Sequence, residues 1–99
     1  MSMIQTGKLQ LKSDAAQATQ GGNTSTFTRV SFPAPFPDGS TVVVLPFTQT
    51  FNGPETPGIR IADVTTAGFL IRFNEVRMST GASDGRHVEE TVGWIASTV

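Results

Sequence analysis

The sequence predicts an all-β protein, and three observations lead to this fold class. The apolar runs are short, they are separated by clusters of turn-forming residues, and no window of helical length has an apolar period free of Gly or Pro. Six such runs in 99 residues predict a single domain, residues 1–99, built as a sandwich or a barrel. The six expected strands cover residues 5–11, 27–32, 41–50, 59–64, 68–76 and 87–97.

Turn-forming segments set the limits of these strands. Residues 13–25, after the first strand, are rich in Ala, Gln, Gly, Asn and Thr, and residues 33–40, after the second, contain three prolines and an Asp-Gly pair. Residues 52–58, before the fourth strand, contain two prolines and two glycines. A loop of Gly, Ser and Asp at residues 79–86 separates the last two strands.

The third strand differs from the others because residues 42–47 are apolar at both parities. Such a run predicts a strand covered on both faces, and without helices the covering element is a second subunit. Pro46 fits an edge or bulged position. Phe36 and Phe51 lie in turn-rich segments, where they either contact another subunit or fold back onto the ends of the domain.

Each of the last two strands places a carboxylate on its apolar face. Glu75 continues the apolar parity of the fifth strand, and Glu90 interrupts that of the sixth. A charge on a core face needs a partner or a function. The apolar residues that define the two faces are Phe69, Ile71 and Phe73 in one strand and Val88, Val92 and Trp94 in the other.

Composition and charge narrow the classes of function. The formal net charge is −1 and the Lys and Arg residues are scattered, which argues against a nucleic-acid partner. No apolar run is long enough to enter a membrane, and the N-terminus lacks a signal-peptide pattern, so we expect no membrane insertion and no export signal in the chain itself. Without cysteine there is neither a disulfide nor a thiolate metal site.

The residue inventory also argues against an enzyme. His87 is the only histidine, no cluster is spaced to complete a zinc site, and no Gly-x-Ser-x-Gly turn presents a nucleophile. Glu75 and Glu90 could form a glycosidase-like pair, but a pair buried on the core side lacks a cleft for sugar. We therefore expect no catalytic residue, no metal and no cofactor.

A polar constellation remains in the second half of the chain. We interpret Glu75 and Glu90 as partners of an arginine that hold the sheet register or a subunit interface, with Arg72 and Trp94 in the same structural group. The alternative is a shallow polar site whose donors and acceptors suit sugar hydroxyls. Asp84 and His87, at a loop-strand junction, are then ligand contacts, or else simply solvated. The constellation comprises Arg60, Arg72, Asn74, Glu75, Arg77, Asp84, His87, Glu89 and Glu90.

The order of several short segments resembles one family. Residues 5–9 match its opening strand, residues 28–36 its strand and proline-rich turn, and residues 42–50 its long apolar strand. Ile59-Arg60-Ile61, the Gly-Phe turn at residues 64–69 and the Trp-Ile-Ala strand at residues 92–96 follow in the family order. Over nearly its whole length the chain is thus similar to the H-type lectin domain of snail agglutinins, discoidins and many microbial proteins.

This resemblance implies a six-stranded antiparallel β-sandwich that assembles as a parallel homotrimer and binds galactose or N-acetylgalactosamine without metal. Arg60 matches the ligand-binding arginine of the middle strand. Glu75-Val76-Arg77 stands where the family has a Trp-His or similar pair, and Asp14 lies near its acidic residue. The candidate ligand-binding residues are Arg60, Arg77, Asp84 and His87.

The function expected from these features is a trimeric, lectin-like module that recognises surface glycans in adhesion or phage-type receptor binding. It acts outside a cell, either secreted or as part of a virion. The alternative is a structural or trimerisation module of a secreted or virion assembly that binds no sugar.

Overall fold

The regular secondary structure in the described part of the chain is entirely β. The computed structural model describes residues 3–75 and 84–99, and this part of the chain contains six strands and no helix, hence none that could cross a membrane. The predicted all-β class is therefore confirmed. The strands are β1 (Ile4–Ser13), β2 (Thr28–Ser31), β3 (Val42–Thr48), β4 (Ile59–Ala62), β5 (Gly68–Phe73) and β6 (His87–Thr98).

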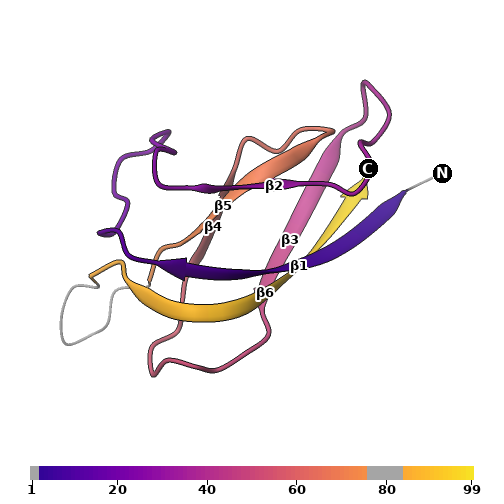
Figure 1. Cartoon of the computed structure of the whole chain (residues 1–99). Helices are drawn as coiled ribbons and strands as arrows, with labels where there is room; N and C mark the ends of the chain where they lie inside the picture. Colours follow the sequence, from indigo (N-terminus) through magenta and orange to yellow (C-terminus); the bar gives the residue numbers. More distant parts are fainter. Residues whose placement is uncertain (1–2, 76–83) are drawn as a thin grey trace.

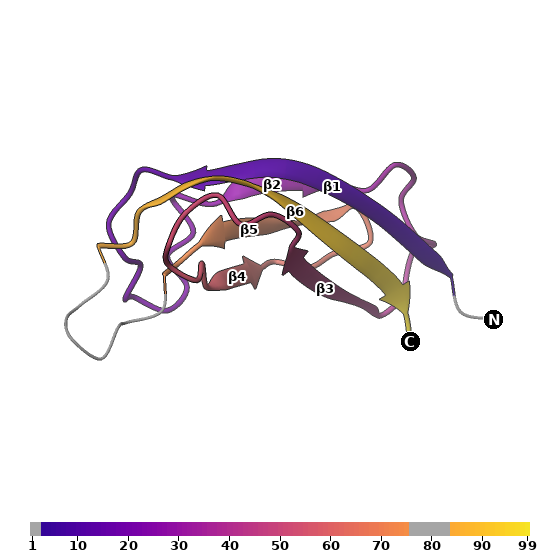
Figure 2. The same ribbon diagram turned by 90° about the horizontal axis from the view of Figure 1, so that it is seen from below.

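The strands form two antiparallel sheets of three strands each (Figures 1 and 2). One sheet has the order β1-β6-β3 and the other the order β2-β5-β4. The first and last strands are paired, with Ile4 opposite Ser97, and this pairing brings the two ends of the chain close together. β6 and β5 are the central strands, and most of their inward-facing residues are buried.

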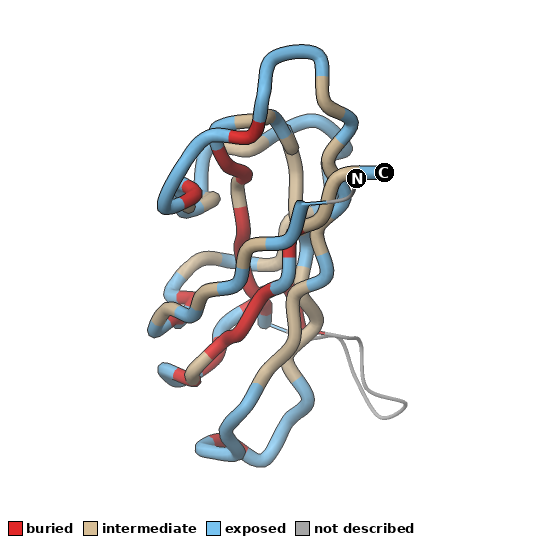
Figure 3. The backbone as a smooth tube through the Cα atoms, turned by 90° about the vertical axis from the view of Figure 1, so that its right-hand side faces the viewer, coloured by how far each residue is buried: buried red, intermediate tan, exposed pale blue. Residues whose placement is uncertain are grey.

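The core lies between the two sheets, and in β5 its residues follow the predicted parity. The tube in Figure 3 shows buried segments concentrated along the inner strands, whereas most of the loops are exposed. In β5 all three predicted apolar residues are buried, and Glu75, just after the strand, is buried too, as predicted. The buried apolar residues are Leu11, Phe32, Phe36, Phe69, Ile71, Phe73, Val92, Trp94 and Ala96.

Aromatic rings fill one end of this core. Phe32 packs against Phe36 with ring centroids 5.1 Å apart, and against Trp94 at 5.5 Å. Trp94 also meets the ring of Phe69 edge-on at 5.7 Å. Phe36 therefore folds back onto the end of the domain, one of its two expected placements. Trp94 is part of the core of a single chain.

β3 is an edge strand, as Pro46 predicts. Val42 and Val44 pack toward the core, while Val43 and Leu45 point outward and are 53% and 62% exposed in the single chain. The apolar residues on the two faces of β3 thus have different surroundings. Within the described part of the chain, only the face toward the core is covered.

All six expected strands occur, with ends that differ by up to two residues among the described ones. β3 was expected to reach residue 50 but ends at Thr48. Beyond it the side chain of Thr50 turns inward and donates a hydrogen bond to Glu90. β5 ends at Phe73, and position 76 of its predicted range lies outside the described residues.

Candidate functional site

The structure separates the predicted ligand-binding residues into two places. Arg60 lies on β4 and faces a pocket formed with the loop between β1 and β2. Asp84 and His87 lie together at the start of β6, near a different loop. Arg77 lies outside the described residues.

The pocket at Arg60 has a volume of about 200 Å³ and a lining that is about equally polar and apolar. Arg60 and Asp63 supply a charged donor and a charged acceptor, and the side chains of Gln20 and Asn23 add amides. The ring of Phe27 contributes an apolar wall. We call this the Arg60 pocket; it is lined by residues 18–24, 27 and 60–63.

Two buried side chains at the end of β5 fix the loop that lines this pocket. Arg72 donates hydrogen bonds to the carbonyl oxygen of Ala16 (2.9 Å) and to the hydroxyl of Thr26. The amide of Asn74 bonds both backbone groups of Ala18: its Oδ1 accepts from the N–H (2.8 Å) and its Nδ2 donates to the carbonyl (3.2 Å). Burial lowers the pKa of Arg72. The loop is thus attached to β5 at three points.

A second group of buried charges lies at the start of β6. The ring of His87 lies between two carboxylates, with Nδ1 3.1 Å from Oε1 of Glu75 and Nε2 2.8 Å from Oε2 of Glu90. The three side chains are only 2%, 4% and 1% exposed. We call them the His87 network. Both ring nitrogens of His87 are engaged inside the protein. The expectation that His87 is a solvated side chain at a loop-strand junction is therefore wrong.

The hydrogen bonds of the His87 network shift the pKa values of its members. Burial by itself lowers the pKa of His87, but hydrogen bonds to Glu90 and Glu75 and the charges of both carboxylates outweigh it, and the pKa is raised. The hydrogen bond from His87 lowers the pKa of Glu90 to about 2. The raised pKa favours the imidazolium form of His87, in which both ring nitrogens donate hydrogen bonds to the two carboxylates.

A β-bulge makes this network possible. In a regular strand, residues three positions apart point to opposite faces. The bulge lies between two register pairs of β1 and β6. There, one residue of β1, Lys12, stands opposite two residues of β6, Val88 and Glu89. The extra residue turns both His87 and Glu90 inward. It also turns Val88 outward, where it is 54% exposed, so its predicted place on the core face is wrong.

Glu90 fixes a second loop, which connects β3 to β4. Its Oε1 accepts hydrogen bonds from the hydroxyl of Thr50 (2.7 Å) and from the backbone N–H of Asn52 (2.9 Å), and its Oε2 accepts from the N–H of Gly53 (3.2 Å). An arginine was expected as the partner of Glu90, but His87 takes that place in the structure. The sequence analysis missed the contribution of this loop, because it lies 37–40 residues away from Glu90 and has no local signature.

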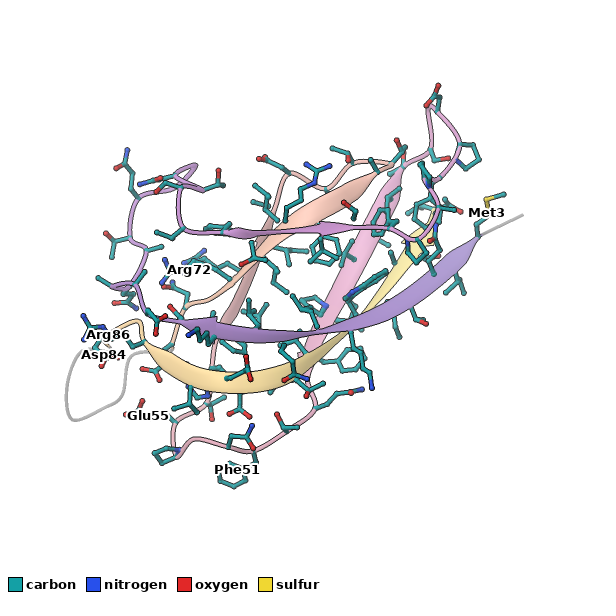
Figure 4. All side chains as sticks on the ribbon, in the orientation of Figure 1. Met3, Phe51, Glu55, Arg72, Asp84 and Arg86 are labelled. Carbon is teal, nitrogen blue, oxygen red and sulfur yellow. The ribbon has the colours of Figure 1, made fainter. Side chains whose placement is uncertain are left out.

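Charged side chains surround the outer surface of the His87 network. Lys12, Asp14, Glu55 and Arg86 line a pocket of about 270 Å³ together with Glu75 and His87. A hydrogen bond with the side chain of Glu75, together with repulsion between the two carboxylates, raises the pKa of Glu55. Asp84 is exposed, and its Oδ1 accepts a hydrogen bond from the backbone N–H of Arg86 (2.9 Å). Glu55, Asp84 and Arg86 lie toward the end of the molecule seen on the left of Figure 4.

The Arg60 pocket and the surface around the His87 network present polar side chains that can hydrogen-bond to a ligand. Within residues 3–75 and 84–99, no group of three or more His, Asp or Glu side chains is placed to hold a metal ion. Arg72, expected in a structural role, binds neutral oxygens, among them the backbone carbonyl of Phe73.

Comparison of the chain with protein-family models, with curated proteins and with solved structures gives no match. The residues and geometry of the chain therefore carry any statement about its function.

Proposed function

We propose that the chain is a carbohydrate-binding, lectin-like module that recognises surface glycans through the Arg60 pocket. The observation that carries the proposal is the mixed chemistry of this pocket. A sugar hydroxyl both donates and accepts hydrogen bonds, and Arg60, Asp63 and the amides of Gln20 and Asn23 supply both partners. The ring of Phe27 offers a surface for the C–H face of a sugar.

The attachment of the loop also supports binding at this place. Arg72 and Asn74 hold residues of the loop between β1 and β2 from buried positions that are not part of the pocket lining. A lining fixed before the ligand arrives loses less conformational entropy on binding. The buried polar residues thus serve the pocket from behind and do not contact the sugar.

We extend the proposal to the assembly that the resemblance to H-type lectins implies. The two antiparallel three-stranded sheets are compatible with its six-stranded β-sandwich, and the proposed assembly is a parallel homotrimer. An exposed apolar group on the outer face of the β1-β6-β3 sheet supports self-association: Ile4, Val43, Leu45 and Ile95 are each at least 38% exposed. Trivalency raises the avidity of a shallow site whose single affinity is weak.

The place of action and the ligand class follow from the same resemblance. The module acts outside a cell, in adhesion or phage-type receptor binding, and takes galactose or N-acetylgalactosamine without metal. A non-catalytic role is supported by His87, because both of its ring nitrogens are already hydrogen-bonded to buried carboxylates.

A glycan array with the assembled protein tests the proposal. We expect a restricted set of bound glycans, with binding weakened in Arg60→Ala and retained in Arg29→Ala. Arg29 is the matched control, since it is an exposed arginine on β2 that does not line the pocket. If a broad array stays silent while the oligomer is intact, carbohydrate recognition is wrong.

The second candidate is a structural or trimerisation module without sugar binding. The apolar outer face around Leu45 favours it, because an interface alone accounts for that face. This function predicts an intact oligomer, a silent array and no effect of Arg60→Ala on mass or stability.

A further inference from the structure

The loop between β3 and β4 is held in place with unusual firmness for an exposed connection. Glu90 is almost completely buried and accepts hydrogen bonds from Thr50, Asn52 and Gly53. The side chain of Asn52 also donates to the carbonyl oxygen of Glu89 (2.8 Å). Burying a carboxylate and a histidine has a desolvation cost. Their use to position this loop therefore suggests that the position of the loop matters. Such inner support is the arrangement expected beneath a binding loop.

Phe51 lies in the middle of this fixed segment and points away from the protein. Its neighbours on both sides, Thr50 and Asn52, are bonded to Glu90, so the backbone cannot easily turn the ring inward. The ring is 88% exposed, and Figure 4 shows it projecting beyond the loop. A large aromatic side chain held outward by a rigid loop is a surface prepared for contact.

A pocket of about 270 Å³ lies beside the ring, and its lining defines the chemistry of an occupant. The hydroxyls of Thr48 and Thr56 and the carboxylate of Glu55 can hydrogen-bond to hydroxyl groups, while Phe51 offers an apolar face. Among the described residues, no lysine or arginine lines this pocket, so they offer an anionic ligand no countercharge there. We call it the Phe51 pocket.

We infer that the Phe51 pocket is a second saccharide site, which takes a neutral or amine-bearing sugar ring. The C–H face of the ring stacks on Phe51, and hydroxyl or ammonium groups donate to Glu55. The inference rests on the proposed carbohydrate-binding function but concerns a separate place: the Phe51 pocket and the Arg60 pocket share no lining residue. One chain would then contact a glycan through two different loops.

The test is a titration of the isotope-labelled protein with galactose, N-acetylgalactosamine, glucosamine and N-acetylneuraminic acid, followed by amide NMR shifts. We expect the neutral and amine-bearing sugars to shift the amides of Asn52 and Thr56. Phe51→Ala should weaken this binding roughly tenfold or more, and Glu55→Gln should weaken glucosamine most. Arg60→Ala should leave these shifts in place. Val99→Ala, which removes a different exposed apolar side chain, is the control.

The remaining outcomes separate the inference from the proposed function. Shifts confined to residues 18–24 and 60–63 and abolished by Arg60→Ala overturn the Phe51 site and leave the Arg60 pocket standing. Shifts at the Phe51 pocket alone support the inference and contradict binding at Arg60. No shift with any sugar overturns both. If Phe51→Ala lowers the mass in solution without changing sugar binding, Phe51 is a subunit contact and the inference is wrong.

Discussion

His87 and Glu90 lie three residues apart in β6, yet Nε2 of one is 2.8 Å from Oε2 of the other inside the protein. The bulge opposite Lys12 brings them to the same side. Through Glu90 this contact reaches the loop that presents Phe51, and through Glu75 it reaches the end of β5. The His87 network is therefore a joint between the strands and an exposed loop.

Removing His87 leaves two buried carboxylates without their shared cation. We expect His87→Ala to lower the free energy of unfolding by about 3–5 kcal/mol, the range for breaking a buried ion pair. Urea denaturation measures this loss. Glu89→Ala is the matched control, because its side chain is exposed on the same strand and should change stability little. Equal stability of the two variants would show that the network contributes nothing.

The pH dependence of stability follows from the two shifted pKa values. The pKa of His87 is raised in the folded state, so its stabilisation is complete below the ordinary value of 6.5 and is lost as the pH rises through the folded pKa. The pKa of Glu90 falls from 4.5 to about 2, so its stabilisation is present above 4.5 and is lost as the pH falls toward 2. The network therefore stabilises most between these limits.

Denaturation at a series of pH values measures this profile, and NMR of the single histidine follows its titration directly. In His87→Gln the decline of stability on the alkaline side should disappear, because the glutamine does not titrate. A histidine that titrates at or below its ordinary pKa in the folded chain would contradict the expected charge state.

Sequence reasoning could place the strands and the core face of β5 because alternation is a local signal, repeated at Phe69, Ile71 and Phe73. It also placed Glu75 inside. The contacts of Glu90 could not be predicted, since they join residues far apart in the chain and depend on a bulge that no local pattern announces. An arginine partner was the reasonable expectation for a buried glutamate, and a histidine turned inward by the bulge took that place.

Gly85 provides a test of how the segment before β6 packs against the loop after β1. Gly85 has φ 77°, and an added Cβ would lie 2.0 Å from the backbone nitrogen of Gln17. Gly39 has φ 82° but open space around it. Both substitutions to alanine incur about 1–2 kcal/mol for the left-handed backbone. Only Gly85→Ala also displaces Gln17, so we expect its melting temperature to fall further. Equal losses in the two variants would contradict this close packing.

Asn74→Ala should loosen the loop that lines the Arg60 pocket without touching the ligand. Its amide satisfies both backbone groups of Ala18, and leaving them unpaired costs about 1–3 kcal/mol. We expect faster hydrogen exchange at Ala18 and weaker sugar binding at the Arg60 pocket, with no change at Phe51. Gln10→Ala, which removes an exposed side-chain hydrogen bond to Thr91 in the other sheet, is the control. Unchanged exchange at Ala18 would mean that Asn74 does not hold the loop.

Leu45→Glu tests whether the outer face of the β1-β6-β3 sheet is the subunit interface. Leu45 points away from the core and stands opposite Ile95, so a charge there should spare the fold of the single chain but oppose association. Light scattering should report a trimer for the parent chain and a monomer for Leu45→Glu, with similar far-ultraviolet circular dichroism. Gln10→Glu is the control, because it adds the same charge on the exposed side of the same sheet, opposite Thr91 and away from the apolar group. A parent chain that is monomeric, or a Leu45→Glu variant that remains trimeric, would place the interface elsewhere or remove it, and Val43 and Leu45 would then need another partner.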